Sequence, residues 1–148
     1  MAHMRERPYV QFNFLVDLGN GNTEGPEAGF QEMSSLQSSV DTIEYRNGNS
    51  KVNSPIKLAG LSRTGNVTLK RGLMGALSLH QWLGEARSGG GLRTVTISLL
   101  DEARTNPVMQ WRLVNARIVK HTSGPFNAKG SDVAIEEIEI ACEYLELE

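Results

Sequence analysis

The chain has 148 residues, 39% of them apolar, and a formal net charge of −2. This length suits one domain with a substantial hydrophobic core, and this composition excludes wholesale disorder. The single cysteine, Cys142, excludes an internal disulfide and a cysteine metal cluster, and we expect a buried structural thiol. No apolar run approaches the ~20 residues of a membrane span. The polar start lacks a signal-peptide pattern, so we expect synthesis in the cytoplasm and no direct membrane insertion.

We expect residues 1–148 to form a single domain whose first half consists of strands and loops. Residues 1–7 are interpreted as a flexible N-terminal arm, and residues 1–3 within it as a candidate cloning remnant. Residues 9–18 alternate in the manner of a strand with one buried face, formed by Val10, Phe12, Phe14, Val16 and Leu18. Loops rich in Gly and Asn are predicted at 19–28 and 47–55, and further strands at 29–36, 40–46, 56–60 and 64–71.

One helix is predicted, from about Leu73 to Arg87. The strand pattern of Val67 and Leu69 ends at Gly72, and the apolar residues that follow recur at helical spacing. The run Ser88-Gly-Gly-Gly91 ends the helix, because glycine readily adopts the left-handed cap conformation. The residues predicted to pack on the sheet are Leu79, Trp82, Leu83 and Ala86.

The second half of the chain is predicted to form strands at 92–101, 108–121 and 131–147, with Val95, Ile97 and Leu99 inward on the first. The second and third strands change phase internally. Apolar residues move to the other parity after Leu113, and again at Glu136-Glu137. A bulge, or a strand that crosses from one sheet to another, would produce each change. Such long bent strands predict a mainly β fold, a barrel or sandwich of antiparallel strands with one short helix.

No set of residues for catalysis or cofactor binding can be assembled. The glycine run at 88–91 lacks the Gly-Lys-Ser/Thr that completes a phosphate-binding loop. His80 and His121 each lack a second ligand at metal spacing, and Glu137 with Glu139 alone makes a poor calcium site. The Lys and Arg residues form no continuous basic platform for nucleic acid. We therefore expect neither an enzyme nor a metal or cofactor site.

The C-terminal segment is strongly acidic. Residues 131–148 carry seven of the 17 acidic residues and no Lys or Arg. Glu137, Glu139 and Glu143 are expected on one face of the last strand. One interpretation is a solvated edge strand whose charge prevents edge-to-edge aggregation. The other is a channel lining, in which a ring of carboxylates from several copies repels acidic cargo and DNA.

Several short motifs follow one another along the chain. They are Gly29-Phe30, Val40-x-x-Ile43-Glu44-Tyr45-Arg46, Val67-Thr-Leu-Lys-Arg-Gly72 before a helix with Trp82, Pro107-Val108, Trp111-x-Leu113-x-Asn115-Ala116, and Gly130-x-Asp132-Val133-Ala134-Ile135-Glu136. In this order and spacing they resemble the tail-tube protein family of contractile phages and related contractile injection systems, including type VI secretion tubes. The resemblance covers roughly residues 8–147, and Ile118 departs from it where a proline is expected.

The resemblance implies a tail-tube fold and six-membered rings that stack into a hollow tube. Sheets would join between subunits into a continuous inner barrel, with helices outside, so that each strand edge is completed by a neighbour. The long polar loop is the candidate contact between stacked rings, and residues 5–8 are a second candidate. The ring-stacking residues predicted are Asn47, Gly48, Asn49, Ser50, Lys51, Val52 and Lys57.

We therefore interpret the chain as a non-catalytic subunit of the inner tube of a phage tail or contractile injection particle, a conduit for protein or DNA cargo. The implied partners are copies of itself, a sheath, and baseplate and spike proteins. The tube would be assembled into a virion tail or into a tail-like particle released from the cell. Two alternatives stay open: a type VI secretion ring that carries effectors, and a monomeric β-barrel module that binds a sugar or peptide.

Overall fold

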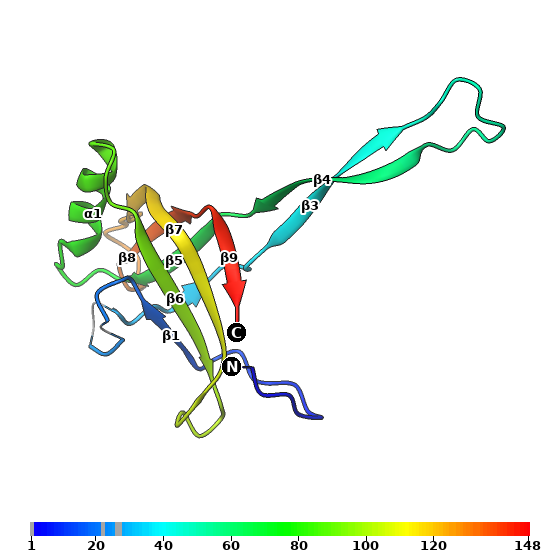
Figure 1. The fold of residues 1–148 in the computed structure, drawn as a ribbon. Helices are drawn as coiled ribbons and strands as arrows, with labels where there is room; N and C mark the ends of the chain where they lie inside the picture. The colour runs from blue at the N-terminus through cyan, green and yellow to red at the C-terminus, as the bar shows by residue number, and fades with distance from the viewer. Residues whose placement is uncertain (1, 22, 26–27) are drawn as a thin grey trace.

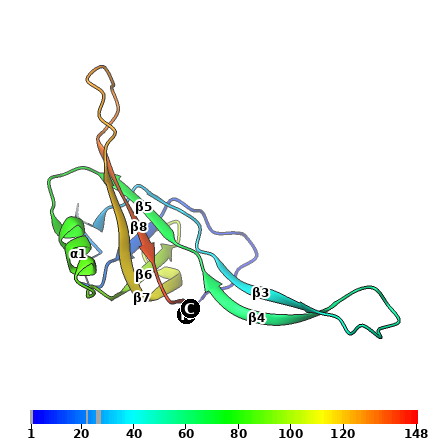
Figure 2. The ribbon, with the colours of Figure 1, turned by 90° about the horizontal axis from the view of Figure 1, so that it is seen from above.

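The computed structural model describes residues 2–21, 23–25 and 28–148. Strands form a curved body with one short helix at its side, and a two-stranded arm projects far from that body (Figures 1 and 2). In chain order the elements are β1 (Phe14–Asp17), β2 (Glu32–Met33), β3 (Ser38–Tyr45), β4 (Ile56–Thr64), β5 (Val67–Gly72), α1 (Ser78–Arg87), β6 (Arg93–Leu100), β7 (Pro107–Ser123), β8 (Ile135–Ala141) and β9 (Tyr144–Leu147).

The body is one antiparallel sheet that the long strand β7 divides into two halves. Its strand order is β1-β6-β7-β8-β5-β2, with β9 also paired to β7. The first part of β7 pairs with β6 and β9, and residues 117–123 pair with β8. We call β2, β5, β8 and residues 117–123 of β7 the β8 half-sheet. The β6 half-sheet consists of β1, β6, β9 and the first part of β7. The predicted mainly β fold of antiparallel strands with one short helix is confirmed.

The two half-sheets enclose one hydrophobic core. Val16 and Ile97 of the β6 half-sheet, and Leu69 and Ile140 of the β8 half-sheet, belong to the same buried cluster. The helix adds Leu79 and Trp82, both almost fully buried, while Leu83 and Ala86 pack partly buried against the same cluster. Burial of side chains this large supplies most of the driving force that holds the helix to the strands.

The predicted phase change in β7 is a β-bulge. The register with β6 shifts between the pairs Val95↔Leu113 and Arg93↔Ala116. Asn115, inside the shift, has a φ of 52°, which asparagine tolerates better than most residues. The buried side of the strand therefore moves from Leu113 to Ala116, as the sequence pattern indicated.

The predicted phase change at Glu136-Glu137 is wrong. β8 alternates without interruption, and Glu136 takes a buried position on the core side, together with Ile138 and Ile140. The apparent flip arose because Val133 lies before the strand and is 74% exposed. The chain does cross between half-sheets, but it does so at Cys142-Glu143, so the expected strand 131–147 is two strands.

Several other predicted boundaries also differ. The strand expected at 9–18 pairs with β6 only over Phe14–Asp17, with one further hydrogen bond of 2.9 Å from Leu100 N–H to the carbonyl of Asn13, and Phe12 is exposed. The strand at 29–36 shrinks to β2, whereas the one at 56–60 extends to Thr64. The helix begins at Ser78 instead of Leu73, and ends before Gly89, whose φ of 87° suits glycine. Of the predicted loop 19–28, residues 22 and 26–27 lie outside the described residues.

Candidate interaction surfaces

The face of the β8 half-sheet that points away from the core, here called the outward face, carries charges of both signs. Glu137 and Glu139 lie on it, partly exposed, beside the cations of neighbouring strands. Lys70 is opposite Glu137, and Lys120 is opposite Glu139. The outward face is thus more balanced in charge than the acidic segment alone indicated. Its members are Glu32, Thr68, Lys70, Lys120, Thr122, Glu137 and Glu139.

Glu143 lies apart from this row of residues. It sits between β8 and β9, where its backbone N–H donates to the carbonyl of Val114 at 3.1 Å. Its carboxylate accepts a hydrogen bond of 2.8 Å from the side-chain amide of Asn115, the residue at the β7 bulge. The structure therefore brings Glu137 and Glu139 together and places Glu143 at the bulge, where it helps to hold the point at which the chain crosses between half-sheets.

The arm formed by β3 and β4 presents an apolar face with no covering element among the described residues. Ile43 is opposite Leu58 and Tyr45 is opposite Ile56, so these four side chains share one face. Each is between 50% and 57% exposed. Because a two-stranded hairpin is marginally stable alone in water, such a face indicates a surface that another molecule covers. We call it the arm's apolar face.

The predicted ring-stacking loop forms the tip of this arm (Figures 1 and 2). The tip is folded by short-range hydrogen bonds: the Tyr45 hydroxyl donates to Asn47 Oδ1 at 2.6 Å, and Arg46 Nε donates to the carbonyl of Val52 at 3.2 Å. Val52 is 63% exposed. Residues 47–52 are therefore at the tip itself, whereas Lys57 lies on β4 opposite Glu44.

Sequence reasoning missed a buried charged network that joins three strands of the β8 half-sheet. The side chains of Arg71 on β5 and Glu136 on β8 are only 1% and 5% exposed, and Arg71 Nε donates to Glu136 Oε1. The other carboxylate oxygen lies 3.1 Å from His121 Nε2 on β7. The ring of His80, on the helix, is edge-on to that of His121, with centroids 5.9 Å apart. The sequence did contain an indication of this network, because Arg71 and Glu136 each stand at a strand position whose neighbours on the same face are apolar.

The N-terminal segment is held against the turn that joins β6 to β7. The guanidinium of Arg5 forms a bidentate ion pair with Glu102 and lies 3.9 Å from the centroid of the Tyr9 ring. The hydrogen bond from Arg5 lowers the pKa of the Glu102 carboxyl to about 2. His3 adds a backbone hydrogen bond of 2.9 Å to the carbonyl of Val108.

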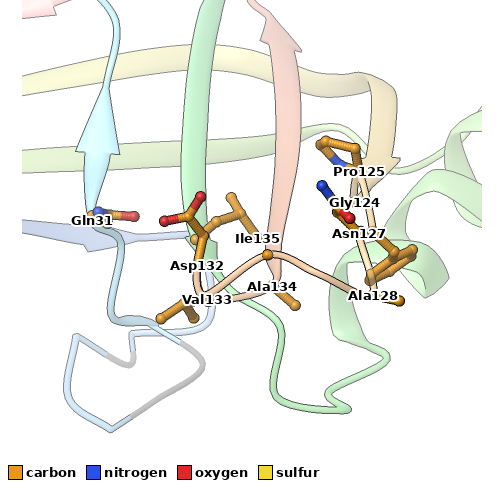
Figure 3. A pocket seen from close by; sticks show the side chains of 12 residues that line it. Gln31, Gly124, Pro125, Asn127, Ala128, Asp132, Val133, Ala134 and Ile135 are labelled. Atoms are coloured by element: carbon orange, nitrogen blue, oxygen red, sulfur yellow. The ribbon is translucent and has the colours of Figure 1, made fainter.

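Described residues of the body line two grooves. One, of about 650 Å³, runs between residues 9–14 and 31–36 over a floor that includes Ile97 and Trp111. The other, of about 1320 Å³, lies under loop 124–135, and Asp132 is the one charged side chain among the described residues that line it (Figure 3). Neither brings together a nucleophile, a base and an oxyanion donor. Within the described ranges, no three His, Cys, Asp or Glu side chains are placed to share a metal ion, and no helix is long and apolar enough to cross a membrane.

Among the described residues, β2 at one end of the strand order pairs on one side alone, and the arm has an uncovered apolar face; both features are typical of a structural protein that assembles with further chains. Residues 10–146 match the family of the T4-like virus tail tube protein gp19. The chain therefore belongs to this tail-tube family, as the sequence motifs indicated. A comparison with curated proteins gave no match.

Solved structures agree with this assignment. A chain of the sheath-tube complex of PVC, an extracellular contractile injection system, in its extended state is 32% identical, with a TM-score of 0.83 over 97% of this chain and 93% of that chain. A chain of the PVC sheath/tube terminator is 30% identical, with a TM-score of 0.84 over 97% and 98%. A chain of the 6-fold symmetrised baseplate of the anti-feeding prophage is 26% identical, with a TM-score of 0.80 over 97% of each.

The type VI alternative shares the fold at a greater distance. A type six secretion system protein is 10% identical, with a TM-score of 0.59 over 93% of this chain and 83% of that chain. At that identity the likeness shows the fold alone. The chain is a structural tail-tube protein whose similarity to extracellular contractile injection systems exceeds its similarity to this type VI protein.

Proposed function

We propose that this chain forms the inner tube of a contractile injection particle as six-membered rings that stack into a hollow conduit, without catalysis. The observation that carries the proposal is a four-stranded half-sheet whose two outer margins have no strand partner within the described residues. Copies arranged around an axis satisfy such margins with one another, and the edge problem is solved by ring closure. The 6-fold symmetry of the similar baseplate structure supports the ring size.

The outward face is the candidate lumen lining, with Glu137 and Glu139 at its centre, whereas Glu143 lies apart from it at the β7 bulge. Alternating charges leave no strong field of one sign, so that neither a basic nor an acidic cargo is held tightly while it slides. The helix then lies on the core side and acts as an outer buttress through Leu79 and Trp82. The cargo of such a conduit is protein or DNA.

The arm is the candidate contact between stacked rings. Its apolar face and its tip, residues 47–52, extend far beyond the body (Figure 2), and we propose that they contact a neighbouring ring along the tube axis. Burial of the four exposed side chains of this face supplies the favourable free energy of stacking, at roughly 25 cal/mol for each Å² of apolar surface removed from water. Residues 5–8 are the second candidate contact.

Partners outside the tube follow from the similar structures. Those structures are a sheath-tube complex, a sheath/tube terminator and a baseplate, each formed by other proteins. A sheath around the tube, and a baseplate with a spike at one end, are therefore the partners we propose for this chain. The site of action is an assembled tail-like particle, and an extracellular injection particle is favoured over a type VI apparatus by sequence identity.

Electron microscopy of the purified protein, with native mass spectrometry, tests the proposal. We expect annular particles with the mass of six chains, and stacks of them at high concentration. Deletion of residues 49–54 should leave a folded subunit that still forms rings, because the tip makes only short-range hydrogen bonds within the arm. Long tubes from that deletion variant would disprove the role of the tip, and a monomer at every concentration would disprove the ring.

A further inference from the structure

The structure assigns a specific seam between neighbouring copies in a ring: the β2 margin of one copy meets residues 117–123 of β7 in the next, and Glu32 pairs with Lys120 across the boundary. This inference rests on the proposed function, since it requires a ring. It adds which margins meet, in which direction the strands run, and which charges select that register.

The two margins are the free edges of the β8 half-sheet. β2 pairs with β5 on one side and has no strand on the other among the residues described. Residues 117–123 of β7 pair with β8 on one side, and β6 reaches only as far as Ala116 on the other. Both edges therefore present backbone groups that a neighbouring chain can approach.

Strand direction makes these margins compatible. β7, β8, β5 and β2 are antiparallel from one to the next, so β7 and β2 run in opposite directions within one copy. Cyclic symmetry keeps the direction of every strand relative to the axis. The β2 of one copy is therefore antiparallel to the β7 of the next, and the alternation continues around the ring without a parallel junction.

Charge complementarity selects the register. On the outward face Glu32 is opposite Lys70, which is opposite Glu137, and Lys120 is opposite Glu139. Each charged side chain in such a row of cross-strand neighbours thus faces a charge of opposite sign. Within the described residues Glu32, at the β2 margin, has such a neighbour on the β5 side alone. The free margin of β7 presents Lys120, and its exposed side chain completes the alternation with Glu32 of the neighbour.

This pairing also predicts a stagger. Within one copy, the row that contains Glu32 ends at Thr122 on β7. When Glu32 meets Lys120 of the neighbour instead of Thr122, the row continues two residues further back along β7. The register therefore shifts by two residues at each boundary between copies. A closed barrel needs such a stagger, because its strands tilt relative to the axis.

Charge reversal tests the seam in the full-length protein. Glu32→Lys and Lys120→Glu should each raise the concentration at which rings form by at least about tenfold, because like charges then meet at every boundary of the ring. The double variant E32K/K120E should restore assembly to within about threefold of the wild-type concentration. Arg104→Glu is a matched control, since Arg104 is exposed in the β6–β7 turn, and it should not change ring formation. Circular dichroism should show every variant folded.

Cross-linking gives a second readout that does not depend on a single ion pair. In a Cys142→Ala background, the pair E32C/K120C should yield covalent oligomers up to a closed ring under oxidation or with a short bismaleimide, whereas either cysteine alone yields at most dimers. The seam would be overturned, and the proposed function left intact, if the wild type formed rings, the single reversals did not change assembly and no cross-linked ladder appeared. A wild type that forms no ring would instead refute the proposed function itself.

Discussion

Removal of one member of the buried Arg71–Glu136 pair should destabilise the subunit severely. Glu136→Gln keeps the shape of the side chain but leaves the guanidinium of Arg71 without its carboxylate, in a site where both side chains are at most 5% exposed. Removal of one partner from a buried ion pair costs about 3–5 kcal/mol. For a chain of this length, each kcal/mol lowers the melting temperature by roughly 2–4 °C, so we expect a fall of about 6–20 °C.

A double substitution that removes both charges isolates the cause of that loss. Arg71→Met with Glu136→Leu removes both charges and keeps similar volumes, and paired apolar replacements of this kind are neutral or stabilising. We expect the double variant to lie within about 1 kcal/mol of the wild type. Urea denaturation at concentrations where the protein is monomeric is the assay, since assembly would raise apparent stability by mass action. A Glu136→Gln loss below about 1 kcal/mol, or equal losses in single and double variants, would refute the reasoning.

Three further predictions concern the helix, the arm and the N-terminal segment. Trp82→Ala should lower the free energy of unfolding by about 3–5 kcal/mol, because the side chain is fully buried; urea denaturation measures this, and a loss near zero would contradict it. Ile43→Ser with Ile56→Ser should abolish stacking yet leave single rings in electron micrographs. Ala59→Ser, on the opposite face of the arm, should leave stacking unchanged. Tubes from the double variant would contradict the arm's role. The contact between Arg5 and Glu102 should persist above pH ~4.5, where the Glu102 carboxyl is charged in both the folded and the unfolded chain. It should weaken as pH falls towards about 2, because folding lowers the pKa of Glu102 to that value. Hydrogen exchange of residues 2–8 follows that loss, and unchanged protection at pH 2 would contradict it.

The parts of the fold that sequence predicted best are those in which one face is buried. Leu79 and Trp82 at helical spacing predicted α1, and the shift from Leu113 to Ala116 predicted the β7 bulge. In these segments burial imposes a period of 3.6 or 2 on the apolar residues, so the pattern and the structure have a common cause.

Prediction failed where a charged residue took a buried position or where the partner lies outside the chain. Glu136 is buried because Arg71, distant in sequence, neutralises it; the apolar parity of each position was visible in the sequence, but no local pattern reports that the two residues pair. The strands of the arm were expected, but their pairing into one long hairpin was not, since Ile43 and Ile56 face solvent in the isolated subunit. The candidate lumen residues Glu137 and Glu139 were placed on one face from parity alone, whereas Lys70 opposite Glu137 became visible only once strand order was known.

High-resolution electron microscopy of particles assembled from the purified full-length protein tests the central claim most directly. The account predicts closed six-membered annuli in which the β8 half-sheets join edge to edge around an open bore, with Glu137 and Glu139 facing that bore. Monomers at high concentration, or rings whose bore is lined by the helix or the β6 half-sheet, would contradict it.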